Sequence, residues 1–357
     1  MPEMRAMADI GNELWDWFIQ ESSSAWFTHT STWIDFIMHM EKPVTSINRS
    51  FGVFDSNRMI AAVPLVEKDI HNERGLRGLS FSSFNTPYPV FSNKLSVAKI
   101  KKAEKYIFSK IMESQGVDYI NYYVCPLTAE ILQKKTIINP LCKFGFHDTS
   151  ISTNIVLFEG DENKLFSRVR KGHKADIKKG EKSGYLIEII GADKISEKLF
   201  NVYRQLHFKA AGKQTRPDAT WDMMKDWIKK GFSMLALCKK GDTYISAALV
   251  NTFKQKAYYQ SGATLPGCEN ERGIGHLMQW EIIKYLNNKA FTHYELGCNY
   301  YPNISQEVAD QKLLGISRFK AGFGGVKYPL FRGEYFFNIN YMEQIYIDRL
   351  NACRETI

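Results

Sequence analysis

The sequence predicts an α/β protein of two domains, each a mixed and mainly antiparallel sheet flanked by helices. Two observations lead to this prediction. The chain has 357 residues and is 44% hydrophobic, which is enough for two domains with cores of ordinary size. The same order of elements also occurs twice: a hairpin, a strand, a loop, a helix and a last strand. Sequence identity between the two copies is slight, so the duplication depends on this pattern alone.

The first copy is predicted within residues 1–150. Two short strands joined by a polar turn occupy 51–69, and a further extended segment occupies 78–91. A lysine-rich helix follows over 96–114, and YINYYVCP at 119–126 is the last strand. The helix begins without a glycine loop. We therefore expect this domain to lack a phosphate-binding loop.

The second copy is predicted within residues 151–335. A hairpin with a Gly-Asp turn covers 232–253, and the next strand covers 256–264. A glycine loop and a helix follow, and then a strand at 294–300. The tail at 336–357 comes after this copy, and we expect it to return to the first domain.

Charge and composition narrow the class of protein. Lysine and arginine exceed aspartate and glutamate by nine, which favours anionic partners such as nucleotide cofactors, sugar nucleotides, RNA or acidic lipid. The six cysteines form no C-x-x-C pair and the eight histidines form no H-x-x-x-H pair, so we expect reduced thiols and no metal site. No apolar run could cross a bilayer and no secretion signal is present, so the expected location is cytoplasmic.

The stretch CENERGIGHLMQWE at 268–281 places Gly273 and Gly275 directly before a helical pattern. A glycine loop between a strand and a helix presents unpaired N–H groups and the positive end of the helix dipole, which suit a pyrophosphate. The Rossmann pattern fails because Met278 replaces its third glycine, and the P-loop pattern is absent. The glycines could also serve only a tight turn.

This loop resembles a motif of the GNAT superfamily of N-acetyltransferases, Arg/Gln-x-x-Gly-x-Gly/Ala, with asparagine in the first position. In that family, backbone amides of the motif hold the pyrophosphate of coenzyme A. The resemblance implies a coenzyme A loop formed by Asn270, Arg272, Gly273, Ile274, Gly275 and His276.

Two further segments resemble the Fem-type aminoacyltransferases, which consist of two linked GNAT domains. Seven Lys and Arg residues lie within 168–182 at helical spacing, as in the basic helix that opens the second domain of that family. The segment RFKAGFGG at 318–325 matches its closing motif. The resemblance covers chiefly residues 160–335 and implies a tandem GNAT fold, with Lys320 acting in transfer or in donor binding. Alternatively, the basic helix is only a solvated charged surface, and Lys320 is only a surface lysine.

Direct attack of an amine on an acyl donor needs no nucleophilic side chain, which agrees with the lack of a Ser-His-Asp or Cys-His arrangement. The strands at 256–264 and 294–300 would be the splayed pair that GNAT folds use to bind the donor carbonyl. His207 is the first candidate for the general base because of its intrinsic pKa, and Asp218 and Glu295 are alternatives. Predicted substrate-binding residues are Lys209, Lys213, Arg216, Trp221 and Tyr259.

The predicted function is N-acyl transfer from acyl-CoA to the amine of a nucleotide-linked amino sugar, of the kind used in surface polysaccharide synthesis. The glycine loop and the lack of a charged heptad insertion favour acyl-CoA as the donor. One alternative is a Fem-type transferase that uses aminoacyl-tRNA and acts on a peptidoglycan precursor. The other is a non-catalytic protein that binds nucleic acid or an anionic surface.

Overall fold

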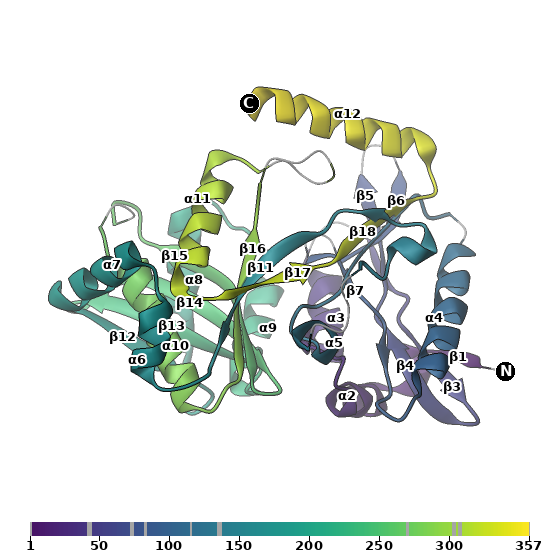
Figure 1. The fold of residues 1–357 in the computed structure, drawn as a ribbon, viewed down its shortest axis with the longest axis horizontal. Coiled ribbons are helices and arrows are strands. Elements are labelled where there is room, and N and C mark those ends of the chain that lie inside the picture. Colours follow the sequence, from purple (N-terminus) through teal and green to yellow (C-terminus); the bar gives the residue numbers. More distant parts are fainter. Residues whose placement is uncertain are drawn as a thin grey trace. The chain divides into compact units, whose positions relative to one another are not determined.

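The computed structural model describes residues 2–356 except 41–44, 72–74, 82–83, 115, 134–137, 269–270, 302–304 and 306–308. The chain forms two compact units (Figure 1). The first contains Met1–Ser152, Tyr300–Leu314 and Tyr328–Ile357, and the second contains Thr153–Asn299 and Gly315–Lys327.

The boundaries of the two units differ from the predicted ones. Residues 300–314 and 328–335, predicted for the second domain, lie in the first unit, as does the tail at 336–357. Strand β18 (Arg332–Phe336) explains part of the difference, because it pairs antiparallel with β9 (Tyr119–Tyr123) of the first unit. This pairing joins residues about two hundred positions apart, which local sequence patterns do not reveal.

The first unit contains two sheets in the part of the chain that the structure describes. One has the strand order β1-β3-β4-β8, and the other has the order β10-β18-β9-β6-β5-β2, with β7 pairing to β9. The remaining strands are β1 (Glu3–Ala6), β2 (Ser46–Asn48), β3 (Phe51–Asp55), β4 (Arg58–Val63), β5 (Val66–His71), β6 (Leu76–Leu79), β7 (Thr86–Pro87), β8 (Val90–Phe91) and β10 (His147–Asp148). The helices are α1 (Met7–Ile10), α2 (Asn12–Glu21), η1 (Phe27–His29), α3 (Ser31–His39), α4 (Val97–Met112), α5 (Ala129–Leu132), η3 (Cys142–Phe144) and α12 (Ile339–Thr356).

The second unit is built on one sheet of order β12-β13-β14-β15-β16-β11-β17. Its strands are β11 (Ile151–Leu157), β12 (Tyr185–Ile190), β13 (Ser233–Lys240), β14 (Thr243–Phe253), β15 (Lys256–Thr264), β16 (His293–Asn299) and β17 (Val326–Leu330). The helices that accompany it are α6 (Glu162–Arg168), α7 (Lys171–Lys182), α8 (Glu197–Ala211), α9 (Asp218–Lys229), α10 (Ile274–Asn288), α11 (Gln311–Lys320) and η4 (Ala321–Phe323). The mixed α/β architecture predicted from the sequence is confirmed.

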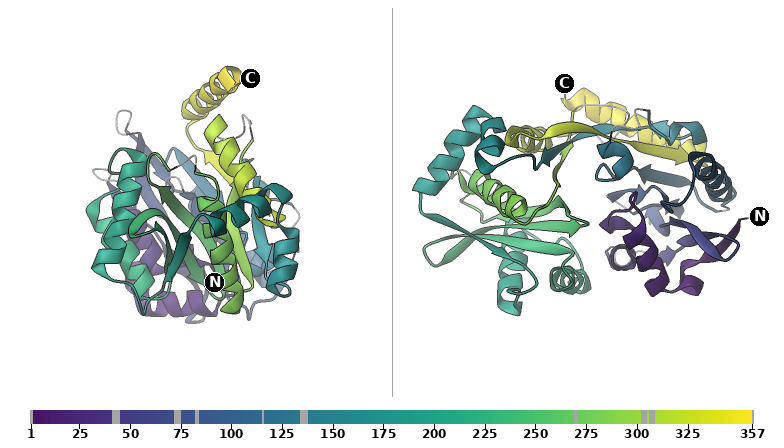
Figure 2. Two further views of the ribbon diagram at one scale, coloured as in Figure 1. Left: turned by 90° about the vertical axis from the view of Figure 1, so that its left-hand side faces the viewer. Right: turned by 60° about the horizontal axis from the view of Figure 1, so that its bottom comes forward.

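Helices cover both faces of this sheet: α10 lies on one face, and α8 and α9 lie on the other (Figure 2). The core under α10 combines residues of that helix with alternate residues of the strands, among them Val250, Ala257, Tyr294 and Leu296. Side chains alternate between the faces of a strand. Glu295, between Tyr294 and Leu296, therefore points to the face of α8 and α9.

The predicted basic helix is two helices, α6 and α7, with a break at Val169 and Arg170. Helix α7 buries His173, Ile177 and Gly180 and leaves most of its lysines exposed, so it is an amphipathic helix with a charged outer face. Among the described residues, no helix is both long enough and apolar enough to cross a membrane.

Candidate active site

The strands β15 and β16 form a splayed parallel pair, as the sequence predicts. Their ladder joins Lys256 with His293, Ala257 with Tyr294, and Tyr258 with Glu295, and both strands continue several residues beyond it. A bulge in β15 shifts its register against β14, because Val250 faces Tyr259 while Leu249 faces Ser261. The bulge changes the direction of β15 just after the ladder ends. Beyond the ladder the two strands therefore do not pair with each other, and we call this part of the strand pair the opening.

Glu295 lies at the start of this opening. Its side chain is almost completely buried, and Thr153 Oγ1 donates a hydrogen bond of 2.8 Å to its Oε1. Burial raises the pKa of the Glu295 carboxyl to about 7, although the Thr153 bond and the nearby Lys320 lower it. A buried carboxylate that takes up a proton near neutral pH has the property that a general base needs.

Lys320 reaches the same opening from the end of α11. A Cβ atom on Gly297 would lie 2.6 Å from Lys320 Nζ, so the ammonium group rests on the backbone of β16. Lys320 Nζ is also 5.8 Å from the centre of the Tyr259 ring on β15. Burial lowers the pKa of Lys320, while Cys298 and Glu295 oppose this shift. The structure thus brings Lys320 and Glu295 together between the two strands.

His207, the first candidate for the base, lies in an aromatic cluster on α8. Its ring centre is 5.4 Å from that of Trp221, and its Nδ1 is 3.3 Å from Thr215 Oγ1. Burial and the charge of Arg216 lower the pKa of His207 to about 4. A group with this pKa is a weak proton acceptor at neutral pH, so its environment favours a packing role.

Asp218, another candidate, is the first residue of α9. Its side chain is 70% exposed and pairs with Arg204 Nη2 at 2.5 Å, and Gln214 Nε2 donates a second bond of 2.7 Å. An acidic residue in the first turn also stabilises the helix dipole. These interactions favour a structural role for Asp218 at the start of α9.

Arg216 is a cation without a carboxylate partner among the described residues. Its guanidinium lies 4.8 Å from the centre of the Trp221 ring, and its Nη1 donates to Met224 Sδ at 2.9 Å. Its Nε is buried and lacks a hydrogen-bond partner among the described residues. Burial lowers the pKa of Arg216. An uncompensated charge of this kind is stabilised when an anion binds to it.

The other predicted substrate-binding residues fall into two groups. Lys209 and Lys213 are exposed on the same segment as Arg216, whereas Trp221 is buried under it. Tyr259 is a packing residue whose hydroxyl fills the space beside Gly262. Burial raises the pKa of Tyr259 to about 12, so it stays neutral. The aromatic cluster of His207 and Trp221 also includes Tyr203, whose hydroxyl forms a hydrogen bond of 2.6 Å with Ser261 of β15.

The glycine loop before α10 has a packing role that the sequence did not predict. Gly273 has φ +102°, and a Cβ there would lie 2.7 Å from Gly180 N and 2.8 Å from Asp176 O of α7. Ile274 is buried in the core. The ring centre of His276 is 4.4 Å from that of His173, and burial lowers the pKa of His276 to about 4. These three residues therefore serve packing between α7 and α10.

Other features of this loop fit an anion. Arg272 is exposed, no side chain in the described part caps Gly273, and the first N–H groups of α10 have no acceptor within the helix. A Cβ on Gly275 would come no closer than 3.4 Å to Phe319, so this position tolerates alanine, as the motif does. Asn270 lies outside the described residues.

The first unit has no comparable opening in its described residues. Strand β6 pairs with β9 at Tyr119 and Ile120, and β7 then pairs with β9 at Tyr122 and Tyr123. Two successive segments thus occupy the edge along which β15 diverges from β16 in the second unit. Helix α4 is capped by Ser96, whose Oγ accepts a bond from the N–H of Lys99.

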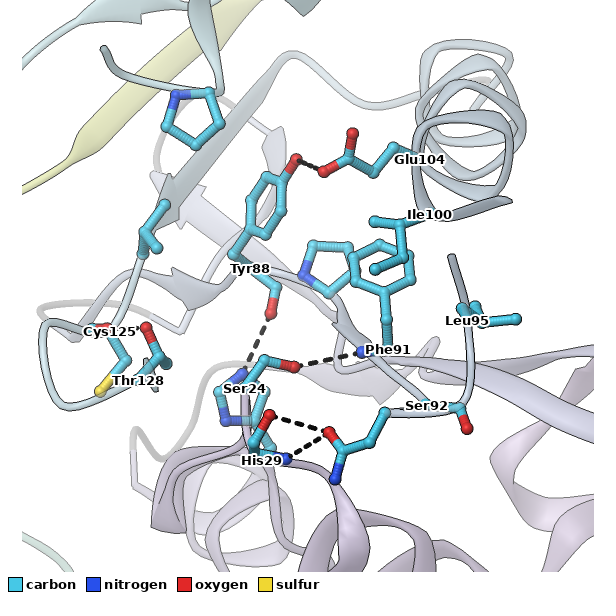
Figure 3. A pocket seen from close by; sticks show the side chains of 15 residues that line it. Ser24, His29, Tyr88, Phe91, Ser92, Leu95, Ile100, Glu104, Cys125 and Thr128 are labelled. Atoms are coloured by element: carbon cyan, nitrogen blue, oxygen red, sulfur yellow. Dashed lines mark hydrogen bonds between the residues drawn. The ribbon is translucent and has the colours of Figure 1, made fainter. Parts of the chain in front are cut away.

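The first unit does contain a cavity of about 320 Å³ between α4, β8 and the end of β9 (Figure 3). Its polar groups bond to one another: Tyr88 donates to Glu104 at 3.0 Å, and Lys143 donates to Glu104 at 2.6 Å. His29 Nδ1 accepts from the Trp26 N–H, and its Nε2 is 3.0 Å from the Tyr88 carbonyl. The protein itself therefore satisfies these groups.

No group of three or more His, Cys, Asp or Glu residues in the described part could hold a metal ion. The described cysteines are not joined in disulfides; they are Cys125, Cys142, Cys238, Cys268, Cys298 and Cys353.

Comparison with known proteins identifies the fold. Residues 167–304 match the family model of the acetyltransferase (GNAT) domain, while no curated protein matches the sequence. The structure of FemX is similar over 96% of this chain and 100% of its own, with a TM-score of 0.65 and 15% identity. The L-PGS structure from Bacillus licheniformis covers 97% and 96% of the two chains, with a TM-score of 0.56 and 12% identity.

A tandem GNAT protein from the clavulanic acid biosynthesis pathway is also similar, with a TM-score of 0.50 and 9% identity over 94% of this chain and 98% of its own. At these identities the structural likeness shows the fold, and the family model adds the type of domain. The chain therefore has a Fem-type tandem GNAT fold, and its second unit carries an N-acyltransferase domain of the GNAT type.

Proposed function

We propose that the second unit transfers an acyl group from acyl-CoA to an amine. The amine attacks the thioester directly, and Glu295 and Lys320 assist this attack. One observation carries this proposal. A carboxyl group with a pKa of about 7 is buried in the opening of a splayed strand pair, and a lysine reaches the same opening. This arrangement supplies a proton acceptor and a positive charge at the place where the fold leaves backbone groups uncovered.

Each group has a defined part in the reaction. The Glu295 carboxylate takes a proton from the acceptor ammonium group, which leaves a neutral amine. The nitrogen attacks the thioester carbonyl, a C–N bond forms and the C–S bond breaks. The nitrogen's remaining extra proton goes to the departing thiolate, and Glu295 later returns its proton to solvent. Lys320 stabilises the negative charge that develops on the carbonyl oxygen.

The donor would bind along β15 with its pyrophosphate at the start of α10. The first N–H groups of α10, together with the exposed Arg272, support this placement. The proposed donor loop consists of Asn270, Arg272, Gly273, Ile274, Gly275 and His276. Gly273, Ile274 and His276 would contribute backbone groups only, because they also pack against α7 or in the core.

The acceptor would carry an anionic group that binds Arg216, with Lys209 and Lys213 beside it. A nucleotide-linked amino sugar combines an amine, which would reach Glu295, with a pyrophosphate, which would bind Arg216. The uncompensated charge of Arg216 and the net charge of +9 support this class of acceptor. Acyl-CoA and sugar nucleotides are cytoplasmic metabolites, so the proposal includes a cytoplasmic location.

The test is thiol release from a panel of acyl-CoA donors in the presence of nucleotide-linked amino sugars. We expect acceptor-dependent release of coenzyme A. Lys320→Ala should lower kcat on the order of 10²-fold, because a preorganised positive charge is lost. Full activity of Lys320→Ala would remove this residue from the site.

One observation favours a second donor, aminoacyl-tRNA. Helix α7 exposes a row of lysines that could bind a phosphate backbone, and FemX and L-PGS share the fold. The exposed lysines are Lys171, Lys178, Lys179 and Lys182. If no acyl-CoA releases thiol while charged tRNA supports transfer to a peptidoglycan precursor, the second donor is correct and the first is wrong.

A further inference from the structure

The glycines of the closing motif at 318–325 pack against β11 and against residues 168–182, called the basic segment below. A Cβ on Gly322 would lie 2.1 Å from His173 Nε2, and one on Gly324 would lie 2.7 Å from Arg168 Cβ. A Cβ on Gly325 would approach the backbone of Ile155 to 3.2 Å. The glycines are therefore places where other parts of the second unit approach the chain closely.

His173 is the central contact between α7 and this motif. It is almost completely buried, and its Nε2 lies 2.8 Å from the carbonyl oxygen of Phe319. Its Nδ1 lies 3.2 Å from Arg170 Nη2. A guanidinium only donates and a carbonyl only accepts, so the neutral tautomer with the proton on Nε2 satisfies both partners.

A third bond comes from the backbone of Arg170, whose N–H donates to the Gly322 carbonyl at 2.9 Å. The partners of His173 and Arg170 thus lie on either side of Lys320. The Phe319 carbonyl belongs to the peptide group that continues into the nitrogen of Lys320. It also lies at the end of α11, where the last carbonyl oxygens of a helix receive no N–H donor from a following helical turn.

We propose that His173 is a positioning residue for Lys320. By holding the Phe319 carbonyl, it fixes the end of α11 and so directs the lysine over Gly297 toward Glu295. The inference rests on the proposed function, because it assumes that Lys320 acts in transfer. It also explains why the basic segment and the closing motif occur together: the first supplies His173 and Arg170, and the second supplies Lys320.

A simple packing role is the competing explanation, because the His173 ring also contacts other aromatic rings. Its centre is 4.8 Å from that of Phe323 and 5.7 Å from that of Phe319. Two variants distinguish the positioning role from the packing role. His173→Phe keeps an aromatic ring and loses both hydrogen bonds, whereas His173→Gln keeps a donor and an acceptor and loses the ring.

The experiment measures kcat and KM for both variants, for Lys320→Ala and for the double variant His173→Phe with Lys320→Ala. We expect His173→Phe to lower kcat on the order of 10- to 100-fold with little change in either KM, because the lysine is displaced. His173→Gln should retain most of the activity. In the Lys320→Ala background, His173→Phe should cause no further loss, since both changes remove the same contribution.

Arg170→Gln provides a second route if His173→Phe does not fold. Arg170 is exposed, and the substitution removes its bond to His173 Nδ1 while the backbone bond to Gly322 remains. We expect a smaller loss of kcat that again disappears in the Lys320→Ala background. Thermal unfolding of each variant shows whether it is folded.

The inference is overturned if the losses from His173→Phe and Lys320→Ala multiply, or if His173→Gln is as impaired as His173→Phe. In both cases Lys320→Ala is still defective, so the proposed function stands. Full activity of Lys320→Ala is a different result. It would remove the proposed role of Lys320, and the role of His173 with it.

Discussion

At the scale of single residues, the site depends on a buried carboxyl group and a largely buried lysine that lie in one opening. Glu295 is almost completely buried and Lys320 rests on the backbone of Gly297. Desolvation raises the pKa of the Glu295 carboxyl to about 7, and it also lowers the pKa of Lys320, against which Cys298 and Glu295 act. A carboxyl group that exchanges a proton near neutral pH suits the general base that acyl transfer to an amine requires.

The Glu295 carboxyl should make stability depend on pH. Its folded pKa of about 7 is above the ordinary carboxyl value of 4.5, so its ionisation opposes folding increasingly as pH rises from 4.5 through 7. Glu295→Gln removes this ionisation. The difference in unfolding free energy between variant and wild type should therefore shift in favour of the variant over that range. Urea unfolding at several pH values measures it, and a constant difference would show that Glu295 does not ionise in this way.

Gly297→Ala should displace Lys320. The new Cβ would lie 2.6 Å from Lys320 Nζ, and the residue has φ +104°, a conformation that alanine adopts only with strain. We expect kcat to fall by at least about tenfold, because a misplaced catalytic group loses its alignment. Gly315→Ala in α11 is the matched control, since nothing lies within 4 Å of its Cβ position. Equal activity of the two variants would contradict the placement of Lys320.

The sequence predicted some site residues and missed others for physical reasons. Lys320 was found from its motif, which needs no knowledge of burial. Intrinsic pKa favours His207 over Glu295 as the base, yet burial reverses that order, because it moves the pKa of His207 to about 4 and that of Glu295 to about 7. Local sequence patterns do not indicate His173, because its partner Phe319 lies 146 residues away. The dense glycines after Phe319 were the available signal for a close contact.

At the scale of elements, the contact between α7 and α10 fixes the start of α10. Gly180 and Gly273 approach so closely that a Cβ on Gly180 would lie 2.8 Å from Gly273 O and 3.0 Å from Leu277 Cβ. Local patterns predicted both helices and the strands around them, since alternation and turn residues are local features. Their close approach is a tertiary property, which the sequence pattern alone did not show.

Gly180→Ala should separate the two helices. Overpacking of this kind costs about 1–3 kcal/mol of stability, and it should also displace the first N–H groups of α10. We therefore expect a lower melting temperature and a higher KM for acyl-CoA, with kcat little changed. Gly172→Ala on the same helix is the control, because nothing lies within 4 Å of its Cβ position. An unchanged KM for Gly180→Ala would argue against donor binding at α10.

At the scale of the whole molecule, two units with related element order differ in one functional respect. In the first, β6 and β7 both pair with β9, and Ser96 caps α4. In the second, β15 leaves β16 after three residue pairs, and α10 begins at an uncapped glycine. The repeated pattern was visible in the sequence. The boundaries between the units were not, because the chain enters each unit more than once.

The pH dependence of kcat/KM for wild type and Glu295→Gln tests the central claim most directly. A general base must be deprotonated to act, so the wild-type value should rise with pH through an apparent pKa near 7, the value for the buried Glu295 carboxyl. The variant should lose activity by about 10²–10⁴-fold and lack this rise. A variant with wild-type activity and the same rise near pH 7 would contradict the assignment of Glu295 as the base.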